Sequence, residues 1–113
     1  MKTIRNMGAQ GDVLFRRINY LPAEAKEVEA KDGKHVVAHS ETGHHHYVEV
    51  VPGLRRFVGS DPLIGYLSVE GVGAEVVHAR PWDTHETLVL TPGIYEVRRQ
   101  KEYVPGGFRR VED

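Results

Sequence analysis

Histidine is the residue type in this chain that points most directly to chemistry. Seven histidines occur in 113 residues, and five of them lie between positions 35 and 46. No cysteine is present, so a metal ion would have to be held by imidazole and carboxylate groups. The stretch SETGHHHYVEV, from Ser40 to Val50, places three consecutive histidines directly after a predicted turn. This stretch is therefore the first candidate for a functional site.

Two strands joined at Thr42-Gly43 would form a hairpin that brings several of these residues together. Side chains alternate across a strand, so His44 and His46 share one face while the histidine between them points to the other. With a two-residue loop, Glu41 lies opposite His44, and His39 lies opposite His46. This register gathers three imidazoles and one carboxylate, a ligand set that suits Zn, Ni, Fe or Mn.

The same hairpin has an alternative register. A bulge at Gly43 shifts the pairing by one residue, so that Ala38 rather than His39 lies opposite His46. The predicted ligands then separate onto two faces, and the histidines form a polar or protonation-sensitive surface. The predicted cofactor is accordingly either none or one divalent metal ion.

A second segment, HARPWDTHE, contains His85, which could supply a distal ligand if the fold brings the two segments together. An H-x-H followed by one distant histidine is similar to the cupins, small jelly rolls that hold one metal ion inside a barrel. The cupin motif has a glycine where this chain has Ala38, and its glutamate comes later than Glu49. The one enzymatic reaction that these residues could support is catalysis by a metal-bound water molecule, with Glu41 or Glu86 as the base.

The arginines occur in pairs, and this pattern constrains the strands that carry them. Neighbours on a strand point to opposite faces, so one arginine of each pair should face the core, where an unpaired charge is costly. We expect these pairs to lie at strand ends, to pair with carboxylates such as Glu70, Glu96 and Glu102, or to be covered by another subunit. The four pairs are Arg16-Arg17, Arg55-Arg56, Arg98-Arg99 and Arg109-Arg110.

The elements that must position these residues are short. Twelve glycines and six prolines divide the chain into alternating or clustered apolar runs, which is typical of strands rather than long helices. The sequence therefore predicts a single all-β domain over residues 1–113, a small β-barrel or β-sandwich of the jelly-roll or cupin-like type. We expect at most one short helix, since the stretch from Pro22 to Ala30 would form either a short helix or an extended arm, and an N-terminal arm over residues 1–9.

The strand predicted from Ile94 to Val104 becomes polar on both faces after Val97. Its second half should leave the core and project as a ribbon or an edge, which a second subunit or a docking partner would cover. We therefore expect a homo-oligomer. The predicted interaction surface consists of basic and aromatic residues of this region: Arg98, Arg99, Lys101, Tyr103, Arg109 and Arg110.

Single-stranded nucleic acid is an alternative partner for this surface, because aromatic rings can stack on bases while cations contact phosphates. Acidic residues dilute the positive charge of the region, and the net charge of the whole chain is −1. Binding through released counterions requires a surplus of positive charge. Nucleic acid is therefore not the partner that we expect.

Several classes of protein find no support in the sequence. It contains no nucleophile elbow, P-loop or H-E-x-x-H motif, so we do not expect an enzyme. No apolar run approaches the roughly 20 residues that span a bilayer, and the N-terminus has no apolar signal core. We expect a protein without a membrane partner and not secreted by a signal peptide.

Three segments of the chain resemble a family of small proteins of bacteriophages and prophages. They are QGDVLFRRI with the LP that follows it, TGHHH, and LVLTPGIYEVRRQKEY. The family pattern reads Q-G-D-V-L, T-G-H-x-H and L-x-P-G-x-Y-x-V-x-R-Q-x-E-Y, and the resemblance extends from Gln10 to about Arg110. Members often carry an H-E-E-H run, of which this chain retains His85 and Glu86. The resemblance implies an origin in a phage or another mobile element.

Phage capsids carry small β domains as decoration, or cement, proteins, and this analogy of architecture extends the prediction. Together with the polar strands and the missing catalytic motifs, it indicates a non-enzymatic interaction or structural protein. Such a protein would be a capsid decoration subunit or an assembly factor, located in the virion or the host cytoplasm. A phage capsid protein would then be one of its partners.

Overall fold

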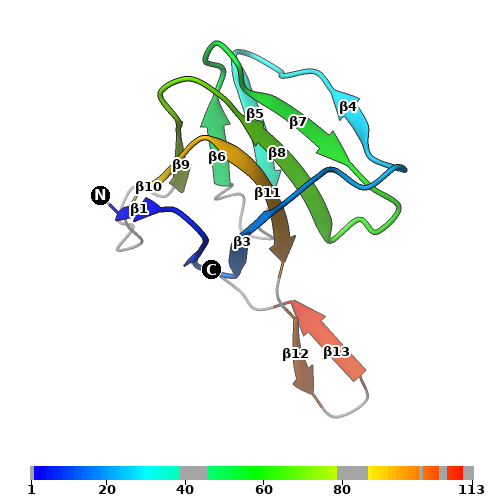
Figure 1. Cartoon of the computed structure of the whole chain (residues 1–113). Coiled ribbons are helices and arrows are strands. Elements are labelled where there is room, and N and C mark those ends of the chain that lie inside the picture. The colour runs from blue at the N-terminus through cyan, green and yellow to red at the C-terminus, as the bar shows by residue number, and fades with distance from the viewer. Residues whose placement is uncertain (1, 39–45, 79–86, 100, 105–106, 111–113) are drawn as a thin grey trace.

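The computed structural model describes residues 2–38, 46–78, 87–99, 101–104 and 107–110. For Ala38, His78 and the last two of these ranges it describes the backbone alone. The described residues form β-strands joined by turns and contain no helix. The predicted all-β class is thus confirmed: two sheets pack together in one small globule, as a β-barrel or β-sandwich does (Figure 1).

The first sheet has five strands and carries the histidine-rich hairpin. Its order is β1 (Lys2–Ile4), β10 (Leu88–Leu90), β9 (Ala74–His78), β6 (His46–Glu49) and β5 (Lys34–Ala38). All neighbours run antiparallel except β1 and β10, which are parallel. The two strands on either side of Thr42-Gly43 pair as predicted.

The second sheet has six strands and carries three of the arginine pairs. Its order is β2 (Met7–Gln10), β3 (Val13–Ile18), β11 (Gly93–Arg99), β8 (Ile64–Val69), β7 (Arg55–Val58) and β4 (Lys26–Val28). All of its neighbours are antiparallel.

The core lies between the two sheets and follows directly from alternation along the strands. Phe15, Leu67 and Tyr95 of the six-stranded sheet are fully buried, and so are Val48 and Val76 of the five-stranded sheet. Full burial of one such apolar side chain stabilises the folded state by about 1.5–3 kcal/mol. This apolar contact holds the two sheets together and defines the inner face of each.

The structure corrects one prediction about local structure and decides between two alternatives for another segment. Residues 2–10 do not form an arm: Lys2–Ile4 pairs with β10, Met7–Gln10 pairs with β3, and Ile4 is buried in the core. Of the two forms considered for Pro22–Ala30, the structure shows the extended one, because Lys26–Val28 pairs with β7 and this overrides a weak helical propensity.

The C-terminal strands form a sheet of their own. The predicted long strand ends at Arg99 in the main body, and β12 (Lys101–Val104) then pairs with β13 (Gly107–Arg110). This hairpin projects away from the two packed sheets (Figure 1). The prediction that the second half of the strand leaves the core as a ribbon is therefore confirmed. Within the described part of the chain, no helix is long and apolar enough to cross a membrane.

Candidate functional site

The β5–β6 hairpin has a register shift at Val37, whereas Gly43, where the sequence placed a bulge, lies outside the described residues. Val36 lies opposite Tyr47, but two residues later Ala38, not His39, lies opposite His46, so the ladder slips by one residue at Val37. This is the pairing in which His39 does not face His46. The other predicted metal ligands, His39, Glu41, His44 and His85, lie outside the described residues.

His46 is fully buried between the sheets, and its ring is held by the β2–β3 turn. Its Nδ1 atom lies 2.8 Å from Oε1 of Gln10, whose Nε2 donates a hydrogen bond of 3.1 Å to the carbonyl of Val76. Because the amide nitrogen of Gln10 is used as a donor to a carbonyl, its oxygen faces the imidazole and must accept. The hydrogen therefore sits on Nδ1, and Nε2 is the ring atom that faces Asp12.

Asp12 occupies the other side of the same imidazole. Its Oδ1 atom lies 3.6 Å from Nε2 of His46, and Asp12 is itself only 6% exposed. The turn between Gln10 and Asp12 contains Gly11 with a φ of 60°, a left-handed conformation that glycine adopts without a steric penalty. Two residues of the Q-G-D segment thus flank one histidine of the T-G-H-H-H segment.

Sequence reasoning missed Gln10 and Asp12 as site residues. Both belong to the QGDVL segment, which sequence analysis used only as a mark of resemblance. Their separation from His46 by more than 30 positions gave no reason to pair them. The one signal was the placement of two polar residues immediately before the apolar run Val13–Phe15.

The strand ends around His46 bring the two histidine-containing segments of the sequence to the same end of the sheet. His46 lies directly opposite His78 in the β6–β9 ladder and opposite Ala38 in the β5–β6 ladder. Directly opposed residues share one face of a sheet. Among the side chains that the structure describes, no group of three His, Asp or Glu is placed to hold a metal ion. A bound divalent ion therefore stays a prediction.

The outward-facing arginines of three pairs find carboxylate partners. Glu96, almost fully buried, contacts Arg16 at 3.2 Å and Arg98 at 3.1 Å. On the neighbouring edge, Arg55 and Glu27 form two hydrogen bonds of 3.1 and 2.7 Å. The expectation that Glu96 pairs with the strand arginines is confirmed. Arg98 is thus engaged in an ion pair on the outer face of β11, while Arg99 faces the opposite way.

The remaining predicted interaction residues lie on the β12–β13 hairpin. Lys101 pairs with Arg110, and Tyr103 pairs with Phe108, so these four positions share one face of the ribbon. Arg109 pairs with Glu102 on the other face. The register therefore separates the aromatic pair and two cations from the acidic residue.

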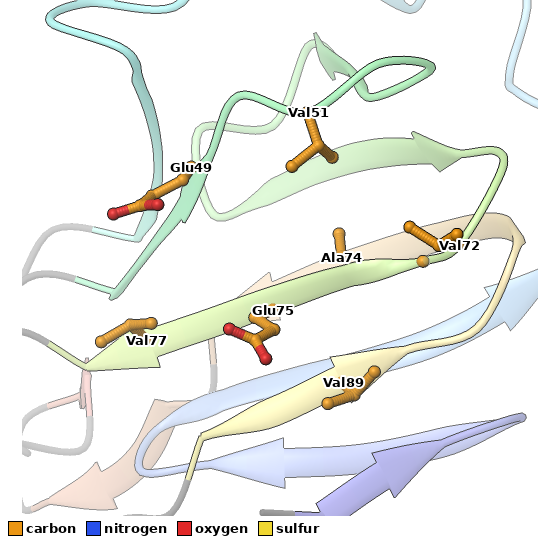
Figure 2. A pocket seen from close by; sticks show the side chains of 8 residues that line it. Glu49, Val51, Val72, Ala74, Glu75, Val77 and Val89 are labelled. Carbon is orange, nitrogen blue, oxygen red and sulfur yellow. The ribbon is translucent and has the colours of Figure 1, made fainter.

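The outer face of the five-stranded sheet is hollowed. A cavity of about 360 Å³ lies over β6, β9 and β10 (Figure 2). Glu49 and Glu75 present carboxylates there from neighbouring strands, beside a wall of valines. The valines that line the cavity are Val51, Val72, Val77 and Val89.

Comparison with known proteins gives a family match and nothing more specific. A family model described as a domain of unknown function (DUF8820) matches residues 9–100. No curated protein and no solved structure matches the chain significantly. The matched range includes the Gln10–Asp12 turn, His46 and β11, and ends just before the β12–β13 hairpin.

Proposed function

The chain belongs to the DUF8820 family, and for it we propose a non-enzymatic role as an interaction protein that docks through the β12–β13 hairpin. The observation that carries this proposal is the isolation of the hairpin: within the described strands, β12 and β13 pair only with each other. A two-stranded hairpin alone is at best marginally stable in water, and its outer edges offer unpaired backbone groups. A partner that covers the hairpin would stabilise it and would pair the backbone groups at its edges.

The composition of the ribbon supports a docking role. One face carries the cross-strand pair Tyr103 and Phe108, flanked by the pair Lys101 and Arg110. Aromatic residues and arginine are enriched at the centres of protein interfaces, where they supply most of the binding free energy. An aromatic pair bordered by two cations fits an apolar surface that also carries negative charge.

The chain itself offers such a surface, which makes a second copy the partner that we favour. The cavity over β6, β9 and β10 combines a wall of valines with the carboxylates of Glu49 and Glu75 (Figure 2). Opposite charges on the hairpin face and in the cavity would orient the docking and suppress wrong pairings. The proposed assembly is therefore a homo-oligomer in which the hairpin of one copy contacts the five-stranded sheet of the next.

The setting that we propose is a phage particle or its assembly. The resemblance to phage and prophage proteins supports a capsid decoration subunit or an assembly factor, acting on the virion or in the host cytoplasm. Co-sedimentation of the purified protein with virions tests this setting independently of self-association.

Sedimentation velocity over a range of protein concentrations tests the docking role. We expect the unmodified protein to self-associate and Tyr103→Ala to weaken association by about tenfold or more, as loss of a central aromatic contact does. Tyr20→Ala is the matched control, because Tyr20 is 76% exposed on another surface. A protein that stays monomeric at every concentration and is absent from particles would refute the proposal.

Metal binding is a second candidate function, favoured by one observation. His46 faces Asp12 across 3.6 Å and lies directly opposite His78, so ligand-type residues from two strands and a turn meet at one end of the sheet. Elemental analysis of untagged protein should then find about one divalent ion per chain, lost in His44→Ala. Purified protein that lacks metal, and whose stability Zn, Ni, Fe or Mn does not change, would exclude this candidate.

A further inference from the structure

Three basic residues occupy core-facing positions on three different strands. His35 lies opposite Val48, Arg56 lies opposite Leu67, and Arg99 lies opposite Val13. Each of these apolar partners is fully buried in the core. Because directly opposed residues share a face, all three basic side chains start from the inner faces of the sheets.

Two of these residues line a small cavity between the sheets. It has a volume of about 100 Å³ and lies between β5 and the turn that joins β7 to β8. Arg56 and Arg99 supply its cationic groups, and Val36, Val37 and Val58 supply apolar walls. The remaining lining comes from the segment 59–65. The cavity is large enough for an oxyanion of the size of phosphate but not for a nucleotide.

Among the residues that the structure describes, no carboxylate balances the charge of Arg56. Its guanidinium forms no hydrogen bond or ion pair with the described residues, whereas its neighbour Arg55 holds Glu27 with two hydrogen bonds. Burial lowers the pKa of Arg56 below its usual value, and no acidic group offsets this effect. A partly buried cation without a counter-ion is unfavourable, so the folded protein would gain stability from a bound anion.

His35 adds a neutral polar group to the same region. It is buried, and its Nδ1 atom has no hydrogen-bond partner within the described structure. Burial and the charge of Arg56 both lower the pKa of His35 below 6.5, while Glu27 opposes them weakly. The imidazole is therefore uncharged at neutral pH and adds no further repulsion between cations.

One acidic residue also borders the cavity. Asp61 is exposed, and its Oδ1 atom accepts a hydrogen bond of 2.8 Å from the backbone N–H of Leu63. That contact ties the carboxylate to its own turn. Asp61 forms no ion pair with Arg56 among the described contacts. Asp61 therefore places a negative charge at the entrance of the cavity but does not neutralise the guanidinium group of Arg56 inside it.

We propose that this cavity binds a phosphate group, either inorganic phosphate or a phosphomonoester, between the guanidinium groups of Arg56 and Arg99. A phosphate carries a charge of about −1.5 to −2 near neutral pH, so it would supply the counter-charge for Arg56 that no described carboxylate provides. The planar fork of arginine suits bidentate contact with phosphate oxygens. This site is independent of the docking role of the β12–β13 hairpin.

Titration of the purified protein with inorganic phosphate, at an ionic strength held constant with sodium chloride, tests the site. We expect saturable shifts of the backbone amide signals of residues 59–61 and 63–65 in ¹H–¹⁵N spectra. Arg56→Gln should weaken binding by about tenfold or more. Arg55→Gln is the matched control, because it removes the same charge from the adjacent position on β7 but on the outer face. It should bind phosphate as the unmodified protein does.

The proposal fails if phosphate causes no saturable shift, or if Arg55→Gln weakens binding as much as Arg56→Gln. Should Arg56→Gln not fold, Arg99→Gln provides the same comparison from β11. Glycerol phosphate distinguishes the source of the ligand. If glycerol phosphate binds as tightly as inorganic phosphate, the ligand of the site is a phosphomonoester. If it binds about tenfold more weakly, the ligand is free phosphate.

Discussion

The Nδ1 atom of His46 lies 2.8 Å from the Oε1 atom of Gln10 inside the core, across 36 positions of the sequence. The same amide donates to the carbonyl of Val76, so one buried side chain satisfies two polar groups on two strands of the opposite sheet. This contact joins the two sheets through hydrogen bonds, next to the contact of Asp12 with the same imidazole.

Replacement of Gln10 by leucine should therefore be strongly destabilising. The change leaves the Nδ1–H group of His46 and the carbonyl of Val76 buried without their partner, and each such group costs about 1–3 kcal/mol. We expect the free energy of unfolding in urea to fall by about 2–4 kcal/mol. Asn19→Leu, an exposed polar-to-apolar change, is the control and should alter it by less than about 0.5 kcal/mol. Equal effects of the two changes would contradict the structural role of the Gln10 amide.

The carboxylate of Glu96 should contribute less to the free energy of unfolding than its burial implies. Its two partners, Arg16 and Arg98, are each about half exposed, with side-chain exposures of 49% and 50%. Water can therefore solvate both guanidinium groups after the carboxylate is removed, and we expect Glu96→Gln to lower the free energy of unfolding by about 1 kcal/mol. Raising the salt concentration should shrink the difference between the two proteins. A loss of stability as large as that of Gln10→Leu would show that the ion pairs of Glu96 with Arg16 and Arg98 are buried in solution.

Acidification should destabilise the protein in part through His35. Burial, reinforced by Arg56, lowers the pKa of this residue in the folded state below the value of 6.5 expected in the unfolded chain. Above pH 6.5 both states are neutral at this position. As the pH falls below 6.5 the unfolded state takes up the proton first, so stability decreases until the pH passes the folded-state pKa.

Urea unfolding of the unmodified protein and of His35→Gln, from about pH 7 to about pH 5, measures this effect. The variant should lose less stability over this interval, because one of the groups that drives the loss is gone. The other histidines are common to both proteins, so the difference between the two curves reports His35. Parallel curves would show that this imidazole does not titrate differently in the two states.

Gly73 should be intolerant of a side chain for two reasons. Its φ is +98°, and an added Cβ would lie 2.6 Å from the backbone carbonyl oxygen of Leu90, which has no freedom to move within the sheet. We expect Gly73→Ala to destabilise the fold by more than about 2 kcal/mol. Gly33 is the matched control, because its φ is +72° but nothing lies within 4 Å of its Cβ position. Gly33→Ala should cost about 1–2 kcal/mol, and equal losses would exclude the steric contribution.

The all-β fold, the hairpin around Thr42-Gly43 and the departure of the C-terminal ribbon from the core could be predicted from the sequence, because all three depend on local patterns. Alternation, turn residues and the loss of apolar residues after Val97 act within a few positions of the chain. The pairing of Glu96 with arginines could also be predicted, because a charge that faces the core or lies among other charges requires a counter-charge. The metal ligands predicted at His39, Glu41, His44 and His85 lie outside the described residues and stay predictions.

What only the tertiary structure decided is the relation between segments that lie far apart in the chain. The sequence left two registers open for the hairpin, one with a two-residue loop and one with a bulge at Gly43, because the choice depends on how β6 packs against β9 and the core. The meeting of Gln10, Asp12 and His46 likewise depends on the stacking of two sheets. The sequence by itself therefore determined which segments are strands and where they turn. The packing of the sheets determined which polar residues face one another between them, since alternation specifies a face but not the partner across it.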